Sequence, residues 1–161
     1  MRFFRSTPRV IPAQPADAPA LADLYRRAWL GCERLVDPRL VADQTPSADD
    51  VLAWFHGGFE VFRVRHEGDL LGAVRCCYPS SACVVDQLAV GPEVRGRGVG
   101  HLLLGHAIGR ARRAGVTRVW AQVSPKLEPS LGLFRALGFR DTTVIHAGYW
   151  AEDLLLLELP I

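Results

Sequence analysis

The sequence predicts an α/β fold, in which a single domain has a mixed central sheet with helices on both faces. Three observations lead to this prediction. Segments with helical periodicity alternate along the chain with segments that have strand periodicity. The predicted strand at residues 82–90 is apolar on both faces, as expected where helices cover both sides of a sheet. The 161 residues, 49% of them hydrophobic, suffice for one core, and no polar linker or internal repeat divides residues 1–161.

Composition and charge exclude several classes of protein. The formal net charge of +2 is small, and basic residues are mixed with acidic ones, which argues against nucleic acid as a partner. No apolar segment has the length of a signal-peptide core or a membrane span, so we expect a cytoplasmic protein without membrane association. The four cysteines lack the spacing of zinc or dithiol sites, so no metal is expected. Cys77 and Cys83 flank a predicted hairpin and could face each other, but free buried thiols are the preferred interpretation.

The N-terminal part of the chain is predicted to start with a short strand and an amphipathic helix. Residues 9–13 form the strand. In residues 17–30, large apolar side chains recur at a spacing of three and four, with Arg26 and Arg27 on the opposite side. This helix therefore has one face for the core and one for solvent.

A second helix follows an irregular stretch. Pro38 and Pro46 bracket that stretch, which we expect to have no regular structure. Ser47, with Asp50 three residues later, resembles a capping box and predicts the start of the helix. Gly57 is predicted to end it.

Three consecutive strands come next. Residues 59–65 alternate between outward and inward side chains, a turn at Gly68 leads to residues 70–78, and a second turn leads to residues 82–90. The remaining predicted elements are a helix at 99–114, a strand at 117–124, a helix at 129–137 and two closing strands at 139–145 and 153–159. In the first of these helices, Gly105 and Gly109 are expected to permit close packing on the sheet.

The segment Arg95-Gly96-Arg97-Gly98-Val99-Gly100 connects a strand to a helix that begins near Gly98. The free backbone N–H groups of the first helical turn, the positive end of the helix dipole and the small glycines together predict an anion site for a pyrophosphate. The side chains of the two arginines add positive charge. A phosphate-binding Walker loop would need Gly-Lys-Ser/Thr, and the dinucleotide fingerprint would need a glycine where His101 stands, so both are excluded.

The pattern Arg-x-x-Gly-x-Gly, entered from Leu88-Ala89-Val90, closely resembles the coenzyme A pyrophosphate loop of the GNAT superfamily of N-acetyltransferases. Further along the chain, Leu133-Phe134-Arg135-Ala136-Leu137-Gly138-Phe139 resembles the second helix motif of the same family. The opening helices, the order of the strands and the closing strands are also similar. The resemblance therefore covers nearly the whole chain.

The resemblance implies a splayed, GNAT-like sheet and a site for acetyl-CoA. Backbone groups of Leu88, Ala89 and Val90 would contact the pantetheine, and the segment from Arg95 to Gly100 would bind the pyrophosphate. A backbone N–H of that strand, with Val90 as the leading candidate, would stabilise the negative charge that develops on the carbonyl oxygen. Phe134 would pack against the cofactor.

The candidate general base is Asp86, in the middle of an apolar strand. The alternation of side chains along a strand predicts that Asp86 lies on the same face as Leu88 and Val90. An aspartate in such a setting needs a reason, because burying an unpaired carboxylate lowers stability. Either Asp86 is a base that acts directly or through water, or it is hydrogen-bonded to backbone or paired with an arginine such as Arg75.

The candidate general acid is Tyr149, in the loop between the closing strands. Many family members have a tyrosine where this chain has Phe134 and an asparagine where it has Leu127, so their usual acid cannot be carried over. Tyr78 is a rival candidate. The alternative for Tyr149 is a packed aromatic cover.

The resemblance places the acceptor beside the first two helices and the closing loop. Aromatic and acidic residues that gather there are Trp29, Glu33, Asp37, Trp54, Phe55, Tyr149 and Trp150. They suit a small cationic amine, so we expect transfer of an acetyl group from acetyl-CoA to a primary amine of a small molecule, by direct attack in a ternary complex. Peptide or protein N-terminal acetylation and a catalytically silent acyl-CoA-binding module are the alternatives. A homodimer is compatible with the exposed closing strands.

Overall fold

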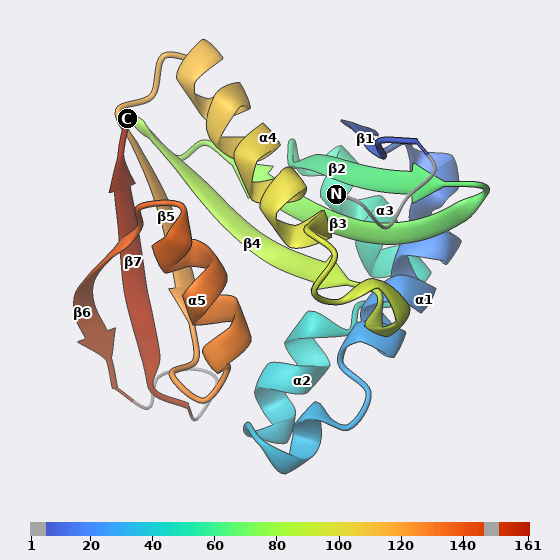
Figure 1. Ribbon diagram of the computed structural model, residues 1–161, viewed down its shortest axis with the longest axis horizontal. Coiled ribbons are helices and arrows are strands. Elements are labelled where there is room, and N and C mark those ends of the chain that lie inside the picture. The colour runs from blue at the N-terminus through green and yellow to red at the C-terminus, as the bar shows by residue number, and fades with distance from the viewer. Residues whose placement is uncertain (1–5, 147–151) are drawn as a thin grey trace.

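The computed structural model describes residues 6–146 and 152–161, and it contains one open sheet in the order β1-β2-β3-β4-β5-β7-β6 (Figure 1). The strands are β1 (Arg9–Pro12), β2 (Glu60–His66), β3 (Asp69–Cys77), β4 (Ala82–Val90), β5 (Arg118–Val123), β6 (Arg140–Ile145) and β7 (Leu154–Pro160). Neighbouring strands are antiparallel, except that β4 and β5 are parallel. Every strand predicted from the sequence is present.

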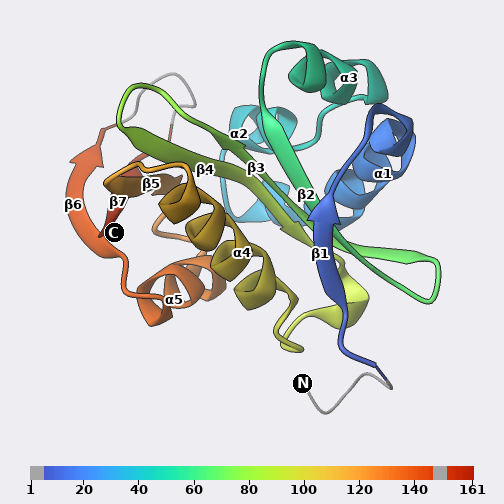
Figure 2. The same ribbon diagram turned by 90° about the horizontal axis from the view of Figure 1, so that it is seen from above.

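Helices cover both faces of this sheet (Figure 2). They are α1 (Ala18–Ala28), α2 (Pro38–Gln44), α3 (Ala48–His56), α4 (Val99–Arg113) and α5 (Glu128–Ala136), with short 3₁₀ turns η1 (Pro15–Asp17), η2 (Cys32–Arg34) and η3 (Pro92–Val94). Helices α1 and α3 lie on one face, and α4 and α5 lie on the other. The predicted fold class, a mixed sheet with helices on both faces, is confirmed. None of the helices in the described ranges is long and apolar enough to cross a bilayer.

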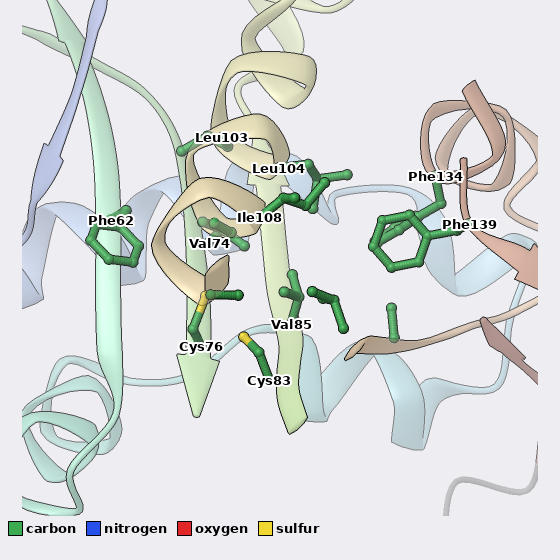
Figure 3. Close-up of a cluster of buried hydrophobic side chains, with 14 of the residues drawn as sticks. Phe62, Val74, Cys76, Cys83, Val85, Leu103, Leu104, Ile108, Phe134 and Phe139 are labelled. Atoms are coloured by element: carbon green, nitrogen blue, oxygen red, sulfur yellow. The ribbon is translucent and has the colours of Figure 1, made fainter. Parts of the chain in front are cut away.

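The larger of the two main cores lies under α4 and α5 (Figure 3). Leu103, Leu104 and Ile108 of α4 point toward β3 and β4, where the sulfurs of Cys76 and Cys83 face each other. All four cysteines are free thiols, as preferred from the sequence. The second main core fills the space between α1, α3 and the opposite face of the sheet.

The start of α3 is fixed by the predicted capping box. The Ser47 hydroxyl accepts a hydrogen bond from the Asp50 backbone N–H (3.1 Å), and the Asp50 carboxylate accepts one from the Ser47 N–H (2.9 Å). The expectation of an irregular stretch between Pro38 and Pro46 is wrong, because α2 lies there. Asp37 caps α2 by accepting from the Arg39 N–H (2.8 Å), and Pro38 occupies the first turn, where a missing N–H does no harm.

The close packing of α4 on the sheet does not depend on the glycines of the helix. A Cβ atom added at Gly105 would meet no atom within 4 Å, so the predicted packing role is wrong. The close approach is at Gly72 of β3. An added Cβ there would lie 2.8 Å from Val99 Cγ1 and 2.9 Å from Leu103 Cδ1. The space for α4 is therefore provided by the strand beneath it.

A β-bulge interrupts β4 near its centre. Between the pairs Arg75↔Asp86 and Ala73↔Ala89, β4 has one residue more than β3, and Gln87 has a φ of 48°. Such an insertion re-aims the side chains on either side of it.

Two hydrogen bonds hold the bulge in place. The Tyr25 hydroxyl donates to the Gln87 carbonyl oxygen (2.6 Å), and Gln87 Nε2 donates to the carbonyl oxygen of Asp43 in α2 (3.0 Å). Burial raises the pKa of Tyr25, so its hydroxyl remains a donor. Helices α1 and α2 thus contact the same point of β4.

The sheet splays beyond the first residues of β4. Its pairing with β5 is limited to Ala82↔Arg118, Cys83↔Val119 and Val84↔Trp120. Within the described ranges, residues 85–90 of β4 do not pair with β5, and the two strands diverge (Figure 1). This divergence creates the opening in which the candidate site lies.

Candidate functional site

A cleft of about 530 Å³ lies between the end of β4 and helix α5. Four parts of the chain form its walls: the end of β4, the glycine loop with the start of α4, the segment after α1, and the start of α5. The lining residues are Ala28, Trp29, Cys32, Leu35, Leu88, Ala89, Val90, Val94, Arg95, Gly96, Gly98, Val99, Gly100, His101, Lys126, Leu127, Pro129, Ser130 and Leu133. Its size is within the range of small-molecule sites.

The glycine loop has the geometry of an anion site. Gly96 (φ 77°) and Gly98 (φ 86°) are both in the left-handed region, which residues with a side chain rarely adopt. Gly98 is the N-cap of α4, and its carbonyl oxygen accepts a hydrogen bond from the Leu102 N–H (3.0 Å), which begins the helical pattern. The N–H groups of the preceding turn are therefore available for a ligand.

Gly100 is needed for a different reason. An added Cβ at Gly100 would lie 2.7 Å from Leu133 Cδ2, so the glycine allows α4 to approach α5 at the cleft. The two helices that border the opening are in this way kept close together.

Most of the predicted cofactor residues surround one opening. Eight of the ten line the cleft: Leu88, Ala89, Val90, Arg95, Gly96, Gly98, Val99 and Gly100. Arg97 is exposed in the same loop but is not among the lining residues, and neither is Phe134. The Phe134 ring is 4% exposed and packs edge-to-face on Phe139, with ring centroids 5.1 Å apart. Contact of these residues with a cofactor stays a prediction.

The side chain of Arg95 contacts α1. Its Nη2 donates to the carbonyl oxygen of Ala28, the last residue of that helix. The last carbonyls of a helix lack partners within it and carry the negative end of the dipole, so a guanidinium stabilises them. Arg95 therefore connects the glycine loop to α1.

Asp86 is paired with Arg75, the second of the two explanations that the sequence left open. Asp86 Oδ1 accepts from Arg75 Nε (2.7 Å) and Oδ2 accepts from Nη2 (2.6 Å). The guanidinium lies over the ring of Trp54, in the core of α1 and α3. Leu88 and Val90 pack against the opposite core. The prediction that all three residues share a face is wrong, because the bulge at the following residue reverses the alternation.

The described residues include one of the two candidate acids, Tyr78. Tyr149 falls in residues 147–151, outside the described residues, and so does Trp150. Tyr78 is not among the residues that line the cleft, and its ring lies 5.7 Å from the Arg110 guanidinium on the α4 side. Burial and the neighbouring Glu60 carboxylate raise the pKa of Tyr78. Tyr78 therefore does not border the cleft, and its role as an acid stays a prediction.

Sequence reasoning missed two basic residues of the cleft, His101 and Lys126. Lys126 Nζ lies 3.2 Å from a carboxylate oxygen of Glu152, whose side chain is 6% exposed. The same oxygen accepts from the Asp37 backbone N–H (2.7 Å). Glu152 thus connects the start of α2, the β5–α5 loop and the segment before β7. A lone lysine in an arginine-rich chain was the available sequence signal.

Of the aromatic residues expected beside the acceptor, Trp29 lines the cleft. Trp54 and Phe55 belong to the core between α1, α3 and the sheet, which explains their apolar character without a ligand. The aromatic composition of this region therefore says little about the acceptor.

Comparison with known proteins gives a family match over most of the chain. The model of the acetyltransferase (GNAT) family matches residues 19–139. An L-amino acid N-acyltransferase, MnaT, of Escherichia coli is 29% identical over 163 aligned residues, which cover 92% of this chain and 91% of that protein. A ribosomal protein bS18-alanine N-acetyltransferase of Salmonella typhimurium is 32% identical over 78 residues, 46% of this chain. The match spans about half (53%) of that relative's length.

Solved structures agree with the fold. A putative acetyltransferase of Salmonella typhimurium, yncA, solved with its cofactor acetyl-CoA, has a TM-score of 0.76 at 25% identity, covering 96% of this chain and 94% of that one. The ribosomal-protein-S18-alanine N-acetyltransferase of Escherichia coli has a TM-score of 0.80 at 20% identity, with 96% and 94% covered. The second likeness concerns the fold alone.

Proposed function

We propose, because the chain belongs to the acetyltransferase (GNAT) family, that it transfers the acetyl group of acetyl-CoA to a primary amine of a small molecule. The observation that best supports this proposal is the cleft. One wall is the end of β4 at Leu88, Ala89 and Val90, and one end is a glycine loop with the geometry of an anion site. A long donor whose pyrophosphate is separated from its thioester by a pantetheine arm suits that combination.

The donor is expected to lie along β4. Oriented N–H groups at the start of α4, with Gly96 and Gly98 in their left-handed conformations, would hold the pyrophosphate, and Arg97 would add charge from the same loop. Main-chain groups of Leu88, Ala89 and Val90 would contact the pantetheine. When bound, acetyl-CoA supplies an acyl group activated as a thioester, which an amine attacks directly. A β4 backbone N–H, that of Val90 first, would donate to the oxygen on which charge develops.

Proton transfer needs a base and an acid, for which Asp86 and Tyr149 are the candidates. Both oxygens of Asp86 accept hydrogen bonds from Arg75, and Asp86 does not line the cleft. This geometry favours a structural role for Asp86 over that of a base. Tyr149 remains the proposed acid and can be tested by substitution with phenylalanine, which should lower kcat if its hydroxyl protonates the leaving thiolate.

The names of several relatives suggest an acceptor that resembles an amino acid. They include the L-amino acid N-acyltransferase and an L-methionine sulfoximine/L-methionine sulfone acetyltransferase of Salmonella typhimurium, which is 26% identical with 92% of each chain covered. A free amino acid carries a carboxylate, and the described cleft residues include the basic His101 and Lys126. Peptide or protein N-terminal acetylation is the alternative, and the relatives named ribosomal protein bS18-alanine N-acetyltransferase suggest a protein acceptor.

The test measures release of coenzyme A thiol by the full chain with acetyl-CoA. One set of reactions contains free L-amino acids, their sulfone and sulfoximine analogues and simple primary amines; a second contains peptides with an N-terminal alanine. Turnover confined to the first set supports the proposal. Turnover confined to the second set would show that the acceptor is a peptide or protein N-terminus. If calorimetry shows coenzyme A binding without turnover in either set, the chain is an acyl-CoA-binding module and the proposal fails. The predicted cytoplasmic location and homodimer remain separate predictions.

A further inference from the structure

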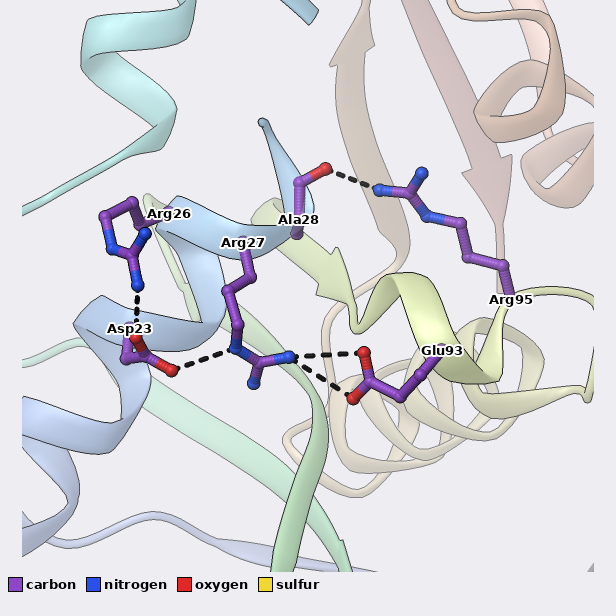
Figure 4. A network of polar contacts seen from close by, with 6 residues as sticks. All are labelled: Asp23, Arg26, Arg27, Ala28, Glu93 and Arg95. Atoms are coloured by element: carbon purple, nitrogen blue, oxygen red, sulfur yellow. Dashed lines mark hydrogen bonds and ion pairs between the residues drawn. The ribbon is translucent and has the colours of Figure 1, made fainter. Parts of the chain in front are cut away.

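The glycine loop and the C-terminal end of α1 are joined by two polar contacts from residues more than sixty positions apart (Figure 4). In the first, the Arg95 guanidinium donates to the Ala28 carbonyl oxygen. In the second, Arg27 Nη1 lies 3.2 Å from each oxygen of Glu93. Both contacts bridge the last turn of α1 and the η3–loop segment.

The second contact is held in place from both sides. The Arg27 guanidinium also donates from Nε to Asp23 (2.9 Å), one turn earlier in α1. Glu93 folds back over Gly91, where an added Cβ would lie 2.5 Å from Glu93 Oε1. The absence of a side chain at Gly91 thus leaves room for Glu93 to reach Arg27.

The Arg27–Glu93 pair contributes little to global stability. The side chains of Arg27 and Glu93 are 32% and 51% exposed. Exposed ion pairs of this kind stabilise a fold by about 0–1 kcal/mol. Removing this pair should therefore leave the fold intact.

The segment that follows Ala28 forms the opposite wall of the same cleft. Trp29, Cys32 and Leu35 line it, together with the loop residues. The segment contains only the short 3₁₀ turn η2 before α2 begins. A shift of the loop is therefore transmitted through Arg95 to the first residue of this wall.

We infer that Arg95 is a positioning residue that clamps the donor loop to the end of α1, so that coenzyme A binding at the loop orders residues 29–36 on the acceptor side. The Arg27–Glu93 pair supports the same junction. This inference rests on the proposed function for the identity of the donor. It differs from the sequence-based expectation, in which Arg95 contributes its charge directly to the pyrophosphate.

The first test uses coenzyme A and amide hydrogen exchange of the full chain, which needs no knowledge of the acceptor. In the wild type, saturating coenzyme A should slow exchange over residues 29–36 by about tenfold or more, because opening of this wall becomes rarer. In Arg95→Ala, coenzyme A should still bind, but the protection of residues 29–36 should fall to less than about threefold. Arg26→Ala is the matched control, because Arg26 pairs with the same Asp23 but does not reach the loop. In this variant, coenzyme A should protect residues 29–36 as much as in the wild type.

The second test separates positioning from direct phosphate binding. If Arg95 contacts the pyrophosphate, Arg95→Ala should weaken coenzyme A binding by about tenfold or more and flatten its salt dependence. Under our inference, the calorimetric Kd should change by less than about threefold with the same salt dependence as the wild type, while the acceptor KM rises about fivefold or more at saturating acetyl-CoA. Arg95→Lys, which keeps one donor at this distance, should restore part of that loss.

The outcomes exclude one another. Equal protection of residues 29–36 in the wild type and Arg95→Ala overturns the inference, and so does loss of coenzyme A affinity with a flattened salt dependence. If the wild-type chain binds no coenzyme A, the proposed function fails first. If Arg95→Ala does not fold, Glu93→Gln weakens the same junction from its exposed side and should show a smaller loss of protection.

Discussion

Arg75 occupies an unusual position among the side chains of this protein, because aromatic rings and a carboxylate all contact its guanidinium. The group lies 4.2 Å from the ring centroid of Phe59 and 4.6 Å from that of Trp54, and it pairs through two hydrogen bonds with Asp86. The Arg75 side chain is 14% exposed. Removal of the carboxylate would leave a largely buried cation without its counter-charge.

Asp86→Asn should therefore act mainly on stability. We expect the free energy of unfolding to fall by about 1–3 kcal/mol, less than for a fully buried pair because the Asp86 side chain is 35% exposed. The kcat of the folded enzyme should stay within about threefold of the wild type. Chemical denaturation and steady-state kinetics on one preparation give both values. A fall in kcat of about a hundredfold at unchanged stability would instead identify Asp86 as the base.

Asp17 gives a prediction for the pH dependence of stability. It accepts hydrogen bonds from the Gln14 backbone N–H (2.8 Å) and from Arg63 Nε (2.9 Å), and its side chain is 11% exposed. Although burial acts to raise it, these donors hold the pKa of Asp17 below its usual 3.8. A carboxyl with a depressed pKa stabilises the fold above the unfolded pKa, and this contribution is lost as pH falls through the folded value.

Asp17→Asn should consequently lower the free energy of unfolding by about 2–4 kcal/mol at pH 6–7. The difference between variant and wild type should shrink as the pH falls below about 4, because the wild-type carboxylate then gains a proton. Chemical denaturation at a series of pH values measures this difference in the free energy of unfolding. Asp50→Asn, at an exposed helix cap, serves as a comparison with a smaller effect. A difference that stays constant down to pH 2 would contradict the assignment.

The contact between α4 and β3 shows how one strand residue decides the packing of a whole helix. Gly72 lies beneath Val99 and Leu103, whereas Gly105 on the same helix faces open space. From the sequence, a glycine in a helix and a glycine in a strand look equally suited to close packing. Only the register of the helix on the sheet, which depends on contacts between distant residues, tells them apart.

Gly72→Ala and Gly105→Ala form a matched pair of substitutions. At Gly72 the new methyl group would overlap Val99 and Leu103, so we expect a loss of about 1–3 kcal/mol from overpacking. At Gly105 the methyl group meets nothing and alanine favours the helix, so we expect a gain of about 0.5–1 kcal/mol. Thermal and chemical denaturation measure both. Changes of the same sign would show that the helix lies differently on the strand.

For the molecule as a whole, the positions of the four thiols report on the packing of both core and cleft. Cys76 and Cys83 are both 0% exposed, whereas Cys32 lines the cleft and Cys77 is half-buried. Burial raises the pKa of Cys32, so its thiol should react slowly but measurably.

A maleimide should therefore label Cys32 and Cys77 in the native protein, and Cys76 and Cys83 only after unfolding. Coenzyme A should slow the labelling of Cys32 by about tenfold when the cleft is saturated, and leave that of Cys77 unchanged. Peptide mapping by mass spectrometry gives the rate at each thiol. Protection of Cys77 instead would place the donor outside the cleft.

Much of this architecture could be predicted from the sequence, because strand alternation, the Ser47 capping box and the glycine loop are local patterns. The same patterns located eight of the residues that line the cleft. Two features could not be predicted from the sequence. Helix α2 was hidden because Pro38 reads as a breaker unless it is recognised as the first helical residue after the Asp37 cap. The side of the sheet taken by Asp86 was hidden because a one-residue bulge reverses the alternation without leaving a mark in the sequence.

The short joint between β4 and β5 has a mechanical consequence. Three residue pairs at one end of β4 and β5 join the half-sheet β1–β4 to the half-sheet formed by β5, β7 and β6. The two strands diverge beyond these pairs, so the angle between the half-sheets depends on the packing at this joint. Cys83 and Val119 at this joint are both 0% exposed. Packing in such a core is sensitive to a change of a single methylene group. A change of side-chain volume there is expected to alter the angle at which the two strands diverge, and with it the width of the cleft.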